Sequence, residues 1–153
     1  MITLEPIGYV RSARHELLDD DWDRVPATIE LTADFEAAAL DGLEQFSHAE
    51  VVFHFDRVAP GSIERGARHP RGNTSWPRVG IFAQRAKDRP NRLGVTVVAI
   101  AGRAGRVLTV RGLDAVDGTP VLDIKPVMRE FLPRGEVRQP AWSHELMRAY
   151  WQA

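Results

Sequence analysis

Residues 94–113, GVTVVAIAGRAGRVLTVRGL, contain two runs of β-branched and apolar residues, separated by the glycines of 102–105. Such runs are typical of β-strands, and glycine lets the backbone reverse tightly between them. We therefore predict strands over 94–101 and 106–113, joined by a hairpin turn at Gly102 to Gly105. An antiparallel hairpin is a basic unit of a mainly β protein.

Further strand-like segments lie on both sides of this hairpin. They span residues 2–10, 28–31, 49–58, 79–83 and 120–124. Apolar residues at helical spacing over 33–43 and 143–151 predict two short helices. Many short strands without a repeated strand–helix alternation favour a mainly antiparallel barrel or sandwich. The fold that we predict is mainly β, a small antiparallel β-barrel with one or two short helices.

Length and composition fit one ordinary globular domain. The chain has 153 residues, of which 44% are hydrophobic and 27% charged, and we expect residues 1–153 to form a single domain. No window approaches the roughly 18 apolar residues of a membrane-spanning helix, and the N-terminus lacks the basic flank of a signal peptide. The lack of cysteine excludes disulfides, thiolate metal sites and cysteine nucleophiles. A cytoplasmic location is the simplest expectation.

The net charge of −1 hides a strong asymmetry along the chain. Residues 1–50 hold twelve acidic and three basic side chains, whereas residues 61–92 hold eight basic and two acidic ones. Arginine forks bind carboxylates and phosphates, so this arginine-rich segment is suited to an anion or a nucleic acid. A solvated basic loop without any ligand has the same composition. Charge alone leaves both interpretations open.

The region from Ala59 to Pro77 has little periodicity and is predicted to be a long loop. Loops of this length in a compact domain are usually functional or disordered. Trp76, at its end, is expected to be exposed, where its ring could stack on an RNA base. Phe82, in a strand-like run, is expected to lie in the core.

Several other functional classes lack their sequence signatures. The five histidines are scattered, with no HxH or HxxxH spacing, so we expect no metal site. The chain has no GxSxG motif, no phosphate-loop pattern and no dinucleotide-binding glycine pattern. A serine hydrolase and a Rossmann-type methyltransferase are therefore not supported.

Five motifs follow one another along the chain. They are IGYVRS at 7–12, GLEQFSHAEVVFHF at 42–55, RHPRGN at 68–73, VGIFAQRAKDRPNRLGVTVV at 79–98 and LDAVDGTPVLDIKP at 113–126. With this set the chain resembles the TsaA-like family of β-barrel S-adenosylmethionine-dependent methyltransferases, which act on tRNA. The resemblance implies a homodimeric enzyme that methylates N6 of threonylcarbamoyladenosine beside the tRNA anticodon.

The resemblance also implies where the cofactor S-adenosylmethionine would bind. The residues expected to contact it are Asp21, Trp22, Asp23, Asp56, Arg57, Arg85, Val95, Asp117, Gly118, Thr119 and Pro120. Among them, the carboxylate of Asp56 or Asp117 and the ring of Trp22 would stabilise the sulfonium, which is a cation. Arg85 would hold the methionine carboxylate.

The residues that bind the substrate are predicted to lie in the arginine-rich segment. Arg68, Arg71 or Arg89 is expected to pair with the carboxylate of the threonylcarbamoyl group, with Asn91 also binding substrate. His69 is the candidate proton acceptor, and water is the alternative.

The chain departs from the common family pattern after Arg85. The residues that differ are Ala86, Lys87, Asp88, Arg92 and Leu93. The chain also stops soon after the last motif, so we expect no additional C-terminal domain, and the arginine loop or a second subunit would have to hold tRNA. Two other functions stay open: a methyltransferase for a small metabolite, and a non-catalytic regulatory module that binds S-adenosylmethionine or RNA.

Overall fold

The hairpin predicted from the sequence is formed by β6 (Leu93–Ala104) and β7 (Val107–Arg111). Its ladder continues to the pair Ala104 and Val107, so the turn has two residues and begins at Gly105, not at Gly102. Gly105 has a φ of 58°, a left-handed conformation that two-residue hairpin turns require and that glycine adopts without strain.

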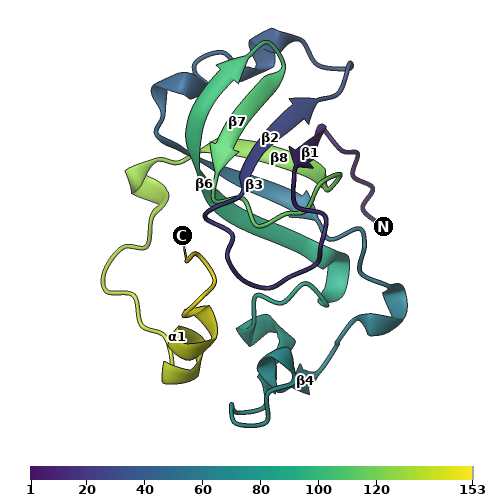
Figure 1. Ribbon diagram of the computed structural model, residues 1–153, viewed down its shortest axis with the longest axis vertical. Coiled ribbons are helices and arrows are strands. Elements are labelled where there is room, and N and C mark those ends of the chain that lie inside the picture. The colour runs from purple at the N-terminus through teal and green to yellow at the C-terminus, as the bar shows by residue number, and fades with distance from the viewer. Residues whose placement is uncertain (153) are drawn as a thin grey trace.

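Six antiparallel strands close into a barrel in the computed structural model, which describes residues 1–152 (Figure 1). Around the barrel the order is β1-β2-β7-β6-β3-β8. The strands not yet given are β1 (Gly8–Ser12), β2 (Pro26–Leu31), β3 (His48–His54) and β8 (Pro120–Pro126). The barrel closes between β1 and β8, where Gly8 pairs with Val121. The predicted small antiparallel barrel is confirmed.

Alternate residues of each strand fill the barrel interior. In β3, Ala49, Val51 and Phe53 are buried, while the residues between them are more exposed. Leu108 and Val110 of β7 belong to the same apolar cluster. Burial contributes roughly 25 cal/mol per Å² of apolar surface, so this cluster is the main source of the barrel's stability.

Two strand boundaries differ from the prediction by four residues or more. β1 begins at Gly8 and not at Ile2, because the first residues make no strand pairing and the side chain of Ile2 is exposed. β3 ends at His54 and not at Val58, because the chain turns there and the Val58 amide donates to the Phe55 carbonyl. The turn brings residues 55–58 out of the sheet.

The predicted helix over 33–43 is not formed. The segment contains 3₁₀ turns at Ala37–Leu40 and Leu43–Gln45, separated by Gly42 with a φ of 87°. A right-handed helix cannot continue through a left-handed residue, and the apolar side chains pack on the barrel core instead. The α-helix found within residues 1–152 is α1 (Ala141–Met147), which begins two residues before the predicted 143–151 helix and ends earlier. No helix of this part is long and apolar enough to cross a membrane.

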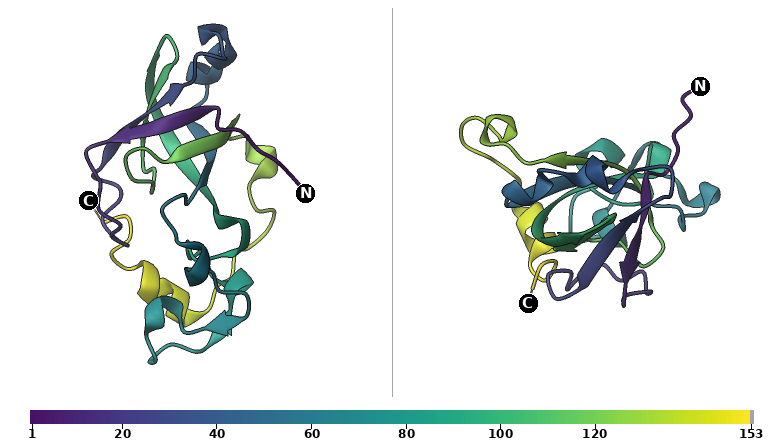
Figure 2. Two further views of the ribbon diagram at one scale, coloured as in Figure 1. Left: turned by 90° about the vertical axis from the view of Figure 1, so that its right-hand side faces the viewer. Right: turned by 90° about the horizontal axis from the view of Figure 1, so that it is seen from above.

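The region from Ala59 to Pro77 contains short elements that the sequence did not predict. It has 3₁₀ turns at Pro60–Ser62 and Pro70–Gly72, and a strand, β4 (Ala67–Arg68), that pairs with β5 (Val79–Gly80). Figures 1 and 2 show this small sheet at the end of the molecule opposite the β6–β7 turn, beside α1.

The predicted strand over 79–83 stops at Gly80, because the 3₁₀ turn Ile81–Ala83 follows it. The turn buries Ile81 and leaves Phe82 78% exposed, so the expected core position of Phe82 is wrong. Trp76, expected to be exposed, is half-buried, and its Nε1 donates to Glu145 of α1 at 2.7 Å.

Gly94 of β6 approaches the ring of Phe53 closely. A Cβ at position 94 would lie 2.5 Å from Cε2 of this ring, which is 1% exposed and has no room to move. We therefore expect Gly94→Ala to lower the free energy of unfolding by about 1–3 kcal/mol in urea denaturation. Gly102→Ala in the same strand is the control, because a Cβ there meets nothing within 4 Å. Equal stability of the two variants would contradict this close packing.

Candidate functional site

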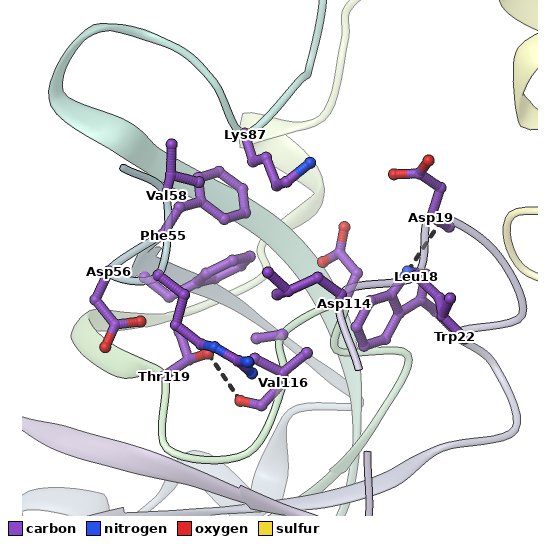
Figure 3. A pocket seen from close by; sticks show the side chains of 14 residues that line it. Leu18, Asp19, Trp22, Phe55, Asp56, Val58, Lys87, Asp114, Val116 and Thr119 are labelled. Carbon is purple, nitrogen blue, oxygen red and sulfur yellow. Dashed lines mark hydrogen bonds between the residues drawn. The ribbon is translucent and has the colours of Figure 1, made fainter. Parts of the chain in front are cut away.

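A pocket lies beyond the end of β3, where four segments of the chain meet (Figure 3). Its walls come from the loop at 17–22, residues 53–58, Lys87 and the segment 114–119. The charged side chains on these walls are those of Asp19, Asp56, Arg57, Lys87 and Asp114. Most other wall residues are apolar or aromatic. An apolar cleft with a few charged groups is the usual form of a small-molecule site.

Four residues predicted to bind the cofactor line this pocket together. They are Trp22, Asp56, Arg57 and Thr119. The other predicted cofactor residues lie outside its walls: Asp21, Asp23, Arg85, Val95, Asp117, Gly118 and Pro120. Sequence reasoning missed three charged wall residues, Asp19, Lys87 and Asp114. Lys87 and Asp114 stand within the quoted motifs, but only the fold reveals that they face the pocket.

Arg14 holds the acidic loop against the barrel. Its guanidinium carbon lies 3.8 Å from the centroid of the Trp22 ring, and its Nη2 and Nη1 donate to the carbonyls of Asp20 and Asp21 at 2.7 and 3.2 Å. The Trp22 Nε1 donates to the Asp19 carbonyl at 3.1 Å. Trp22 is only 5% exposed, although it lies in an acidic loop. Arg14 therefore fixes one pocket wall and covers one face of the Trp22 ring.

The turn Asp117 to Pro120 leads into β8 and is hydrogen-bonded to β1. The Gly118 amide donates to the Val10 carbonyl at 2.8 Å, and the Val10 amide donates to the Thr119 carbonyl at 2.9 Å. The Asp117 carboxylate accepts from the Ser12 amide at 3.0 Å, which holds the turn against the end of β1. Of the two carboxylates predicted for the sulfonium, only Asp56 lines the pocket.

Arg85 and Val95, each predicted to contact the cofactor, are in direct contact with each other. The Arg85 Nη2 donates to the Val95 carbonyl at 2.6 Å. Both residues are exposed and lie outside the pocket walls. The contact attaches the segment before Arg89 to the first half of β6.

The three arginines predicted for the substrate carboxylate already have partners within the chain. Arg68 pairs with Asp88 at 3.0 Å, and Arg71 pairs with Asp20 at 3.1 Å. Arg89 donates to the carbonyl of Gln84 at 2.6 Å. None of the three lines the pocket.

The other predicted substrate-side residues also lie outside the pocket walls. His69 Nδ1 is 2.7 Å from the Trp76 carbonyl oxygen, and because that oxygen can only accept, Nδ1 is the donor. Asn91 is exposed in a turn with a φ of 64°. Within residues 1–152, no group of three or more histidine or acidic side chains is arranged to hold a metal ion.

Asp114 is a pocket carboxylate with both oxygens engaged. The Thr96 hydroxyl in β6 donates to Oδ1, and the Tyr150 hydroxyl beyond α1 donates to Oδ2. Burial of Tyr150, together with the negative charge and hydrogen bond of Asp114, raises the pKa of Tyr150 above its ordinary value. The tyrosine is therefore a neutral hydrogen-bond donor at neutral pH.

The barrel and the pocket walls fall within a known family. The model of the tRNA-methyltransferase O N-terminal domain matches residues 20–131. The chain belongs to this family. The match confirms the family resemblance found in the sequence, and it includes all pocket residues except those at 17–19.

Individual proteins are similar to most of this chain. A probable S-adenosyl-L-methionine-binding protein of Pyrococcus abyssi is 35% identical over 144 residues, covering 90% of this chain and 74% of the relative. The tRNA (adenine(37)-N6)-methyltransferase of Escherichia coli is 39% identical over 99 residues, covering 61% of this chain but 41% of the relative. A crystal structure of TrmO from Pseudomonas aeruginosa superposes with a TM-score of 0.74 and 32% identity, covering 93% of this chain and 62% of that one. The chain thus spans only part of the length of these relatives.

The contacts of Arg14 predict its importance for stability. Arg14→Ala removes the stacking on Trp22 and two hydrogen bonds to loop carbonyls, so we expect a loss of about 2 kcal/mol in the free energy of unfolding. Arg11→Ala is the control, because the ion pair of Arg11 with Glu30 at 3.3 Å is exposed and contributes little. Urea denaturation measures both variants, and equal losses would contradict the role given to Arg14.

Proposed function

We propose that this protein uses S-adenosylmethionine to methylate N6 of an adenosine in tRNA, namely the threonylcarbamoyl-modified adenosine beside the anticodon. The observation that carries the proposal is the pocket, where three carboxylates, two cations and aromatic rings meet in a domain of the tRNA-methyltransferase O family. A tRNA substrate would put the activity in the cytoplasm.

The charges of the pocket fit S-adenosylmethionine, which carries a sulfonium, an ammonium and a carboxylate. Asp19, Asp56 and Asp114 are suited to its two positive groups, and the aromatic wall is suited to its apolar parts. When bound, the cofactor supplies an electrophilic methyl group. Transfer needs an in-line approach of the acceptor nitrogen, so the task of these residues is to hold the reactants in that geometry.

Lys87 is the pocket cation best suited to the methionine carboxylate. Within residues 1–152 its ammonium makes no hydrogen bond or ion pair, whereas Arg57 donates to the carbonyl of His15 at 2.6 Å. Arg85, the residue expected for this role from the family resemblance, is outside the walls and binds the Val95 carbonyl. We therefore propose that Lys87 binds the methionine carboxylate of the cofactor.

The arginine-rich segment is the proposed contact with tRNA. Although Arg68, Arg71 and Arg89 have internal partners, Arg65 and Arg78 are exposed and make no hydrogen bond or ion pair in the described part of the chain. Free guanidinium groups on one segment are suited to RNA phosphates, which attract them at long range.

The proposed function is tested with purified protein, labelled S-adenosylmethionine and tRNA from cells that lack this methylation. We expect the label on threonylcarbamoyladenosine when the digested nucleosides are separated by mass spectrometry. Label in a metabolite extract but not in tRNA would support the small-molecule enzyme instead. Calorimetric binding of the cofactor without any transfer would support the regulatory module.

The role proposed for Lys87 is tested by substituting each of the two lysines of the chain. Lys87→Gln should weaken S-adenosylmethionine binding about tenfold in calorimetry, because a charged hydrogen bond to the carboxylate is lost. Lys125→Gln is the matched control, since Lys125 pairs with Asp123 on β8 and lies outside the pocket walls. Unchanged affinity in the Lys87 variant would remove this residue from the cofactor site.

We also propose that the protein is a homodimer. Leu93, Val95 and Val97 alternate along the outer face of β6 and are exposed, as is Phe82. Exposed apolar rows of this kind often mark association surfaces. Because Val95 contacts Arg85, a second subunit that packs on this face would also cover Arg85. Light scattering that gives a monomer at micromolar concentration would contradict the dimer.

A further inference from the structure

The C-terminal residues 141–152 contact three parts of the site, although they lie outside the range matched by the family. Glu145 of α1 accepts from Trp76 in the region before β5 at 2.7 Å. The amides of Asp21 and Trp22 donate to the carbonyls of Ala149 and Tyr150 at 3.0 and 2.9 Å. Figures 1 and 2 show α1 beside the β4–β5 sheet, with the chain end leading back toward the barrel. This segment therefore joins the acidic loop to the arginine-rich region.

The same segment contacts a pocket wall, because the Tyr150 hydroxyl donates to Asp114. One carboxylate oxygen of Asp114 accepts from Tyr150, and the other accepts from the Thr96 hydroxyl. A carboxylate with a single donor can still rotate about its own bond, whereas donors on both oxygens define its plane. Tyr150 does not line the pocket, so it can act on a ligand only through Asp114.

We propose that Tyr150 is a positioning residue, whose hydroxyl orients the Asp114 carboxylate toward the positive groups of the bound cofactor. The identity of that ligand rests on the proposed function. A preorganised carboxylate binds a cation more tightly than a mobile one, because it loses little conformational entropy on binding. The Tyr150 ring also packs edge-on against Trp151, with centroids 4.9 Å apart, and phenylalanine would keep this contact.

Because the chain has only two tyrosines, Tyr150 can be titrated alone, which tests its buried position beside Asp114. In a Tyr9→Phe background, tyrosinate absorbance reports Tyr150 alone, while circular dichroism reports the fold. Burial and then Asp114 raise the Tyr150 pKa, and Arg85 and Arg71 act against them. We expect little ionisation at about pH 10, where a free tyrosine is half ionised. Half ionisation there with the fold intact would overturn the proposal, whichever ligand the protein binds.

The effect on the cofactor is measured with Tyr150→Phe, and Tyr9→Phe is the control. We expect about tenfold weaker binding of S-adenosylmethionine in calorimetry, and a matching rise in the KM for the cofactor with the KM for tRNA unchanged. Mere destabilisation would reduce the amount of active enzyme, which lowers the apparent kcat but leaves both KM values as they were.

The possible outcomes separate this inference from the proposed function. Wild-type protein that methylates tRNA, with equal cofactor affinity in both tyrosine variants, would overturn the role of Tyr150 and leave the function intact. Wild-type protein that does not bind S-adenosylmethionine would overturn the proposed function and the positioning role with it, while the titration would still test the buried position of Tyr150 beside Asp114.

Discussion

The first half of β6 pairs on one side only, and two segments that lead to the pocket walls are attached to this part of the strand. β3 pairs with β6 from Leu93 to Ala99, whereas β7 joins it only from Ala99 onward. Polar backbone groups on a strand edge need other partners. Arg85 supplies one by donating to the Val95 carbonyl, and the Thr96 side chain binds Asp114. Two separate segments, one carrying Arg85 and the other Asp114, are thereby fixed at the same edge.

Charge complementarity within the chain determines how the loops around the pocket lie. The acidic N-terminal third and the basic middle segment meet where Arg71 pairs with Asp20, 51 positions earlier in the sequence. Arg68 and Arg89 are likewise satisfied internally. Much of the positive charge that suggested an anion site therefore stabilises the fold, and the free cations are fewer than the sequence suggests.

The barrel could be predicted largely from sequence because its strands alternate buried and exposed residues and its hairpin has a glycine turn. The 33–43 helix failed because apolar spacing does not reveal the left-handed backbone of Gly42. Trp22 and Asp56 line the pocket, and the family resemblance had already placed the loop around Trp22 and the segment after the 49–55 strand near the cofactor. Lys87 and Tyr150 could not be found in this way, because their roles depend on tertiary neighbours distant in sequence.

Tyr150 also affects the order in which the protein can mature during synthesis. Every strand of the barrel precedes it in the chain, and β1 can pair with β8 once Val121 has been made. Domains commonly begin to fold while the rest of the chain is still being translated. Until Tyr150 has left the ribosome, only the Thr96 hydroxyl of these two can donate to Asp114. A nascent chain can therefore possess a closed barrel before it possesses a finished pocket.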